Sequence, residues 1–117
     1  ESVLVGGTVY SLEIADTEAT QILGLGNRES LCGTCGMLFV FKREERHSFW
    51  MHGMKFPIDI AWINKENRII HLERRVSEHS TEVYRPPAPV SLVLELPAGA
   101  FDTLSIGEQV NFQKEKH

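Results

Sequence analysis

Residues 47–63, HSFWMHGMKFPIDIAWI, gather many of the side chains that could bind a ligand or move a proton. His52 and Met54 offer an imidazole and a thioether, which are donors that suit copper, especially its reduced ion. Cys32 and Cys35, in the motif CGTC, would extend that donor set if all four side chains lay close together. The pattern leaves open a copper or zinc site made by these four residues, although methionine is also a common core filler.

The cysteine pair by itself has several interpretations. In an exported protein Cys32 and Cys35 could close a small disulfide, whereas in the cytosol they could be a thiol pair or half of a metal site. A complete structural zinc site would need two more ligands from elsewhere in the chain. A single C-x-x-C motif does not decide between these alternatives.

Two carboxyl groups stand beside apolar residues. Asp59 follows Pro57 at the start of an apolar run, and Glu95 lies in LVLELPAG. A carboxyl group in an apolar setting has a raised pKa, which general acid catalysis can use, so a hydrolase with Asp59 or Glu95 as its acid/base is one hypothesis. Pairing of Asp59 with Arg28 would lower that pKa instead, and we favour this structural pairing. Glu95 could likewise accept hydrogen bonds from amides of the turn that follows it.

No Ser-His-Asp order, glycine-rich phosphate loop or HExxH motif is present in the sequence. We therefore assign no catalytic residue and no cofactor, and favour a protein that is not an enzyme. Phe49 and Trp50 are neighbours on an expected strand, so their side chains should face opposite ways, one into the core and one towards a surface or mouth. An exposed tryptophan can stack on a ring-bearing ligand. We predict a binding surface formed by Arg28, Trp50, His52 and Asp59, with simple packing as the alternative for the aromatic residues.

The overall charge disfavours one large class of partner. Twelve basic and sixteen acidic residues give a formal charge of -4, whereas nucleic-acid binding needs a basic face. No apolar run approaches the roughly 18 residues of a membrane span. The 117 residues predict one domain, 1–117, with its core at about 8–113 and a polar tail at 113–117. We expect a monomer whose ligand or protein partner is unknown.

Alternation and turn residues predict a mainly β protein. TVYSLEIAD alternates with a period of two, and NKEN separates two strand-like runs as a hairpin turn. A second hairpin is expected across KREER, and short helices are expected after Asp16, with Ile22 and Leu25 facing inward, and from Pro97. Prolines confine residues 77–89 to a sheet edge at best. The predicted strands, in a compact antiparallel sandwich or barrel, are 8–15, 36–41, 47–51, 58–63, 68–75, 90–96 and 108–113.

The order of several motifs resembles one known family. NRESL, GMLFVF, FWM, FPIDIAWI and VLELPAG follow one another here as in the small bacterial and archaeal family called domain of unknown function 192. The resemblance implies a compact β-rich domain with no established reaction, often preceded by an export signal, and we expect an exported binding or accessory module. Its motif positions in this chain are Arg28, Gly36, Met37, Phe49, Trp50, Met51, Pro57, Asp59, Glu95, Pro97 and Gly99.

Two stretches depart from the family pattern. Gly26 and Asn27 replace the usual methionine and aromatic residue before Arg28. His52, Gly53 and Met54 replace the usual Lys-Asn-Thr after FWM. A shared site that used those lysine and asparagine side chains would therefore be altered in this chain.

Overall fold

Strands dominate residues 1–113, which the computed structural model describes. A seven-stranded sheet contains β1 (Ser2–Val5), β2 (Thr8–Ala15), β3 (Cys35–Glu45), β5 (Ile58–Ile63), β6 (Ile69–Val76), β8 (Val90–Pro97) and β9 (Asn111–Gln113). Its order is β6-β5-β8-β3-β2-β1-β9. A separate small sheet pairs β4 (Phe49–Trp50) with β7 (Val83–Tyr84), and the helix α1 spans Glu18–Leu23. The predicted mainly β fold is confirmed, while the predicted polar tail lies, after residue 113, outside the described part of the chain.

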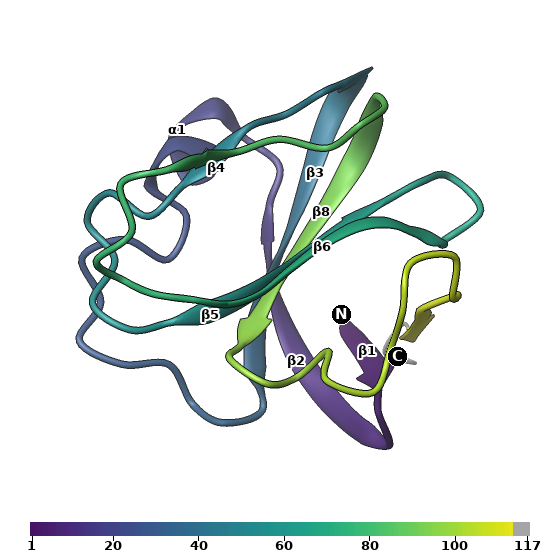
Figure 1. The fold of residues 1–117 in the computed structure, drawn as a ribbon, viewed down its shortest axis with the longest axis horizontal. Helices are drawn as coiled ribbons and strands as arrows, with labels where there is room; N and C mark the ends of the chain where they lie inside the picture. The colour runs from purple at the N-terminus through teal and green to yellow at the C-terminus, as the bar shows by residue number, and fades with distance from the viewer. Residues whose placement is uncertain (114–117) are drawn as a thin grey trace.

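The large sheet is strongly curled, which brings the region before β9 towards the start of β6 (Figure 1). Its neighbouring strands are antiparallel except for β2 and β3, which run parallel. The segment before β9 reaches the start of β6, where the amide of Ile69 donates to the carbonyl of Glu108 at 2.9 Å. The amide of Val110 donates to the carbonyl of Asn67 at 2.8 Å in the same region. The curled sheet is thus a half-barrel, which agrees with the barrel-like form of the prediction.

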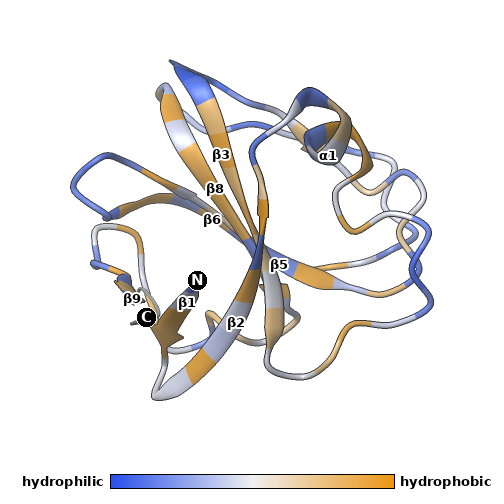
Figure 2. Ribbon diagram, turned by 180° about the vertical axis from the view of Figure 1, so that it is seen from behind, coloured by the Kyte–Doolittle hydropathy of each residue, from blue (hydrophilic) through white to orange (hydrophobic). Residues whose placement is uncertain are grey.

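Each face of the central strands carries its own hydrophobic core. Successive residues of a strand point to opposite faces, so Leu94 and Leu96 of β8 belong to the core inside the curled sheet, and Val93 belongs to the other core. Figure 2 shows hydrophobic residues along β3, β5 and β8. The second core lies on the side where Figure 1 places α1 and β4, away from β1. These short elements, and the segments around them, therefore cover a sheet face that would otherwise be exposed.

Helix α1 is held at both ends by local hydrogen bonds. Thr17 is its N-cap and exchanges side-chain and backbone hydrogen bonds with Thr20. Gly24 ends it with a positive φ of 52°, a conformation that glycine adopts without a Cβ clash. The predicted inward orientation is correct for Leu25, which is buried, and wrong for Ile22, which is 78% exposed. The inward position belongs to Gln21, whose Nε2 donates to the carbonyls of Ala15 and Val40.

Of the two predicted hairpins, one is confirmed and one is wrong. β5 and β6 pair across the NKEN turn, with Ala61 opposite Leu72. The other hairpin does not form, because β3 continues through residues 42–45 instead of turning there. The strand partners of β3 are β2 and β8, and β4 pairs with β7 instead.

The helix predicted from Pro97 is also wrong. Residues 98–103 form successive turns, in which the amide of Ala100 donates to the carbonyl of Pro97 at 3.0 Å. Gly99 has a φ of 95°, which is incompatible with a right-handed helix. No helix among the described residues is long and apolar enough to cross a membrane.

Candidate functional site

A cavity of about 570 Å³ lies over the second hydrophobic core, between α1, the β4 segment and strands β3 and β8. Its walls come from four parts of the chain that are distant in sequence. They are α1 with the glycine-rich turn after it, two phenylalanines of β3, residues 45–50 with His52 and Met54, and one residue of β8. At its rim, Ile22 and Trp50 are 78% and 60% exposed. The cavity therefore has both apolar and polar walls, and it opens towards solvent beside two large hydrophobic side chains.

Glu95 is the β8 residue that lines this cavity. Its partners on the neighbouring strands are Met37 and Ile60, which are both buried and apolar. Glu95 is only 5% exposed and has no charged cross-strand neighbour. Burial raises the pKa of Glu95 to about 8, because the charged form loses its hydration. Within residues 1–113, no hydrogen bond or ion pair involves its side chain. The carboxyl group therefore lines the cavity without a protein partner.

Three phenylalanine rings build one wall of the cavity. The ring of Phe49 meets that of Phe39 edge-to-face at 4.8 Å between centroids, and that of Phe41 at 6.3 Å. The imidazole of His47 stacks on Phe41 at 3.6 Å. The carbonyl of His47 accepts a hydrogen bond from Nε1 of the buried Trp62 at 2.8 Å, which anchors the segment leading into β4. The rings are thus held in fixed relative orientations.

Two residues of the predicted binding surface lie together at the rim. Trp50 and His52 stack with ring centroids 5.0 Å apart, and both line the cavity. The neighbouring Phe49 turns the other way and packs against the second core, which confirms the predicted opposite orientation of the two aromatic residues. Arg28 and Asp59, the other two residues of that prediction, are not among the residues that line the cavity.

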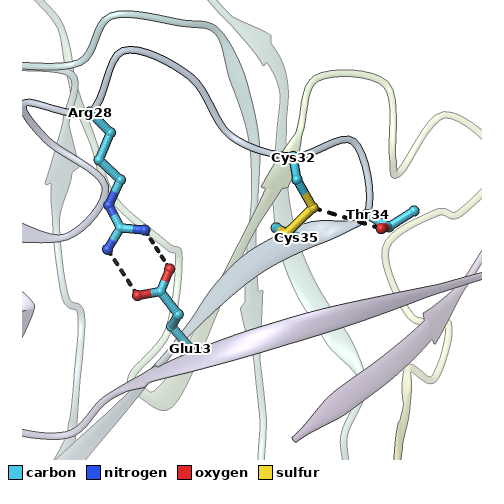
Figure 3. Close-up of a disulfide and its surroundings, with 5 residues drawn as sticks. All are labelled: Glu13, Arg28, Cys32, Thr34 and Cys35. Atoms are coloured by element: carbon cyan, nitrogen blue, oxygen red, sulfur yellow. Dashed lines mark hydrogen bonds and ion pairs between the residues drawn. A yellow bond between two sulfur atoms is a disulfide. The ribbon is translucent and has the colours of Figure 1, made fainter.

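Asp59 is fully buried and serves the backbone. Its Oδ1 accepts hydrogen bonds from the amides of Arg75 at 2.7 Å and Gly99 at 3.1 Å, and its Oδ2 from that of Phe101 at 2.9 Å. The predicted pairing with Arg28 is wrong, because Arg28 forms a two-bond ion pair with Glu13 (Figure 3). The Arg28 guanidinium lowers the pKa of Glu13 chiefly through these hydrogen bonds. The amides of the turn after β8 therefore donate to Asp59, and the expectation that Glu95 accepts from them is wrong.

The cysteines form a disulfide at the start of β3. Cys32 and Cys35 are joined with their Cα atoms 5.1 Å apart, and Figure 3 shows the bridge beside Thr34. Joined sulfurs do not provide the thiolates that copper or zinc binds. The four-residue metal hypothesis is therefore reduced to His52 and Met54, which line the cavity without the cysteines. Nor does any group of three or more His, Cys, Asp or Glu side chains in residues 1–113 have an arrangement suited to a metal ion.

Sequence reasoning missed the aromatic wall and did not connect it to Glu95. A signal for the wall existed, because Phe39 and Phe41 are two positions apart on a strand and must face the same side. The signal for Glu95 was a charge within the apolar strand sequence VLEL. The phenylalanine wall and Glu95 come together because antiparallel pairing places Phe39 opposite Val93 and Met37 opposite Glu95. The sequence alone does not show this register.

Comparisons with known proteins give a family and a fold. The family model DUF192, described as an uncharacterized ACR, matches residues 2–112. A crystal structure from Sinorhizobium meliloti, described as a candidate transcription regulator, has a TM-score of 0.84 and 25% identity, over 94% of this chain and 89% of that one. A protein of unknown function from Novosphingobium aromaticivorans has a TM-score of 0.85 and 24% identity, over 95% of this chain and 82% of that one. No curated protein matches the chain.

Proposed function

We propose, from the premise that this chain belongs to the uncharacterized DUF192 family, that it is a binding module whose cavity takes a small organic molecule. The observation that carries this proposal is Glu95. A buried polar group in a native protein is nearly always hydrogen-bonded, and burial of an unpaired carboxyl group costs stability. Glu95 has no protein partner in the described part of the chain, where no sealed side-chain oxygen or nitrogen lacks a hydrogen bond, so its carboxyl oxygens are open to the cavity. A bound molecule would supply the missing partner.

The form of the cavity supports the same conclusion. Small-molecule sites are concave, mostly apolar and of roughly 300–1,000 Å³, with few polar groups that fix the orientation of the ligand. The volume of about 570 Å³ lies in this range, and the phenylalanine wall and the carboxyl group of Glu95 provide an apolar surface and an orienting polar group, although other polar side chains also line the cavity. Trp50 at the rim offers an exposed ring face on which a ligand can stack.

The structure bears differently on the two hydrolase hypotheses and on a regulatory role. A hydrolase that uses Asp59 is disfavoured, because three backbone amides occupy its carboxylate and the residue is fully buried. A hydrolase that uses Glu95 would share the proposed cavity and would show turnover as well as binding. The Sinorhizobium meliloti protein is described as a candidate transcription regulator, but a formal charge of -4 does not favour DNA binding by this chain.

The disulfide supports a proposal about location. Disulfides persist in oxidising compartments and are rare in the cytosol, so the Cys32–Cys35 bridge favours an exported protein. Rapid alkylation of free thiols in cells that make the protein naturally, followed by mass spectrometry, tests this. We expect both cysteines to escape alkylation, and full alkylation of both would contradict export.

A fragment screen by two-dimensional NMR tests the binding function. A library of small aromatic and aliphatic amines, alcohols and acids should include compounds that shift the amide signals of residues 22–26 and 46–54, which surround the cavity. Phe41→Ala should weaken these compounds, since it removes part of the wall. Ile106→Ala is the matched control, because Ile106 is 61% exposed and lies outside the cavity. Absence of binding at millimolar concentrations, or shifts confined to another surface, would refute the proposal.

A further inference from the structure

We infer that the ligand carries an organic ammonium group, which binds between the carboxylate of Glu95 and the phenylalanine wall of the cavity. This inference rests on the proposed binding function and names the chemical class of the molecule. It combines an acidic group without a protein partner with aromatic rings that line the same cavity.

The aromatic rings offer the electrostatics that a cation needs. The face of a phenylalanine or tryptophan ring is negative and attracts ammonium groups within about 6 Å of its centre. Phe39 and Phe41 meet Phe49 at interplanar angles of 85° and 78°, so rings of different orientation share one wall. Trp50 adds a fourth ring at the rim. A compact organic cation could therefore contact more than one ring at the same time.

The sheet register places the carboxyl group beside this wall. Phe39 pairs with Val93, and the next pair on the same face is Met37 with Glu95. Phe39 and Glu95 are consequently diagonal neighbours, a relationship in which long side chains can contact one ligand. Both residues line the cavity, so an ammonium group there can reach a ring face and a carboxylate together.

The ionisable groups around the cavity also favour a cation. α1 contributes Glu18, and the segment before β4 contributes Glu45, Arg46 and His47. Together with Glu95, the cavity lining therefore contains three carboxyl groups and one guanidinium group. The Nε of that guanidinium group, on Arg46, already donates to the carbonyl of Pro86 at 2.8 Å. His52 lies at the rim, while the strands beside Glu95 contribute the uncharged Met37 and Ile60. Burial raises the pKa of Glu95, and a bound cation would lower that pKa again because it stabilises the carboxylate.

Proton balance gives the inference a distinctive signature. Because the pKa of Glu95 is about 8 without ligand, its carboxyl group is mostly protonated at pH 7. Binding of an ammonium group stabilises the carboxylate, so the carboxyl proton passes to solvent as the cation binds. Affinity should rise as pH increases towards 8 and then level off, since above that pH no proton has to leave. A neutral ligand of the same shape should show no such rise.

The test compares choline with 3,3-dimethyl-1-butanol, which replaces the charged nitrogen by carbon and keeps the shape. NMR titrations at pH 6, 7, 8 and 9 should show choline binding up to about tenfold more tightly per pH unit below pH 8, and no trend for the alcohol. Glu95→Gln should remove both the pH trend and the preference for choline. Phe41→Leu should weaken choline by roughly threefold to thirtyfold, the range of cation–π energies, and the alcohol less. Thermal melts confirm that each variant is folded.

The outcomes separate this inference from the proposed function. Equal binding of choline and the alcohol at pH 9, or unchanged choline binding by the folded Glu95→Gln variant, would overturn the ammonium assignment and leave a binding cavity. No choline binding at pH 9, combined with neutral compounds that bind in the fragment screen, would do the same. Failure of both choline and the whole fragment library would refute the binding function itself.

Discussion

The Oδ2 atom of Asp59 accepts a hydrogen bond of 2.9 Å from the backbone amide of Phe101, 42 positions further along the chain. Its Oδ1 atom accepts two more, from the amides of Arg75 and Gly99. One buried carboxylate therefore ties β5 to the end of β6 and to the turns after β8. Arg75 has a φ of 49°, a left-handed conformation uncommon for residues other than glycine, and the bond from its amide helps to hold it there.

We predict that Asp59→Asn lowers the free energy of unfolding by about 1–3 kcal/mol, the cost of leaving a buried donor unpaired. Asparagine keeps one accepting oxygen, but its NH2 group takes the place of the other. This NH2 group would point either at the amides of Arg75 and Gly99 or at the amide of Phe101, so that donors oppose each other. Urea denaturation of the variant and the wild type measures the loss. Arg28→Ala is the control, because its ion pair with Glu13 is 35% and 54% exposed and should contribute less than about 1 kcal/mol. Equal losses in both variants would contradict this account.

Local patterns were enough to predict much of the fold. Alternation in residues 8–15 and 90–96 predicted β2 and β8, and the NKEN turn predicted the pairing of β5 with β6. The failures concern partners chosen across the chain. β2 and β3 pair in parallel across the connection that contains α1, and no local signal shows this pairing or that of β4 with β7.

The candidate site shows the same division. The sequence marked Asp59 as a charge beside apolar residues, but the amides that bind it come from β6 and from the turns after β8. Arg28 pairs instead with Glu13 of β2, which is closer to it in the sequence than Asp59 is. Trp50 and His52 could be predicted as an exposed pair because they are close in sequence, whereas the convergence of Glu95 with Phe39 depends on the sheet register.

The disulfide should add modest stability without affecting the cavity. It closes a very short loop, for which the chain-entropy relation gives about 2 kcal/mol. Replacement of both Cys32 and Cys35 by serine should lower the free energy of unfolding by that amount in urea denaturation. Reduction of the wild type should give a similar loss. NMR signals of the cavity residues should stay in place, and their displacement would show that the bridge also shapes the site.

The two tryptophans should differ in how much their substitution destabilises the protein and in how readily their fluorescence is quenched. Trp50 is 60% exposed, so Trp50→Phe should change the free energy of unfolding by less than about 0.5 kcal/mol. Trp62 is fully buried and donates to the carbonyl of His47, so Trp62→Phe should cost about 1–3 kcal/mol. Acrylamide should quench the single tryptophan left in Trp62→Phe and barely quench that left in Trp50→Phe. The reverse order would contradict the assignment of Trp50 to the rim.

Gly36 lies where β3 and β8 approach closely. A Cβ atom on this residue would lie 2.6 Å from the backbone oxygen of Glu95, closer than such atoms approach in folded proteins, and would also overlap the side chain of Leu96. Gly36→Ala should therefore lower the free energy of unfolding by about 1–3 kcal/mol, as overpacking does. Gly33→Ala is the matched control, since a Cβ there meets nothing within 4 Å. Comparable stability of both variants in urea would refute this packing argument.

Glu95 should make the stability of the protein fall as pH rises. Its pKa is about 8 in the folded chain, because burial disfavours the charged form, and about 4.3 in an unfolded chain. Between these values the folded state holds a proton that the unfolded state has lost, so each pH unit removes up to about 1.4 kcal/mol from the free energy of unfolding. The loss is absent below the unfolded value, where both states are protonated, and is complete above about pH 8.

Glu95→Gln keeps the shape of the side chain and removes its titration. Other groups also titrate between pH 4 and pH 9, so the informative quantity is the difference in unfolding free energy between variant and wild type, measured by urea denaturation at each pH. We expect that difference to grow in favour of the variant from about pH 5 and to become constant above about pH 8. Parallel curves would mean that Glu95 is not a buried, protonated acid. A carboxyl group that weakens its own fold at neutral pH is most readily retained if it serves a ligand, which is why this measurement bears on the function as well as on the fold.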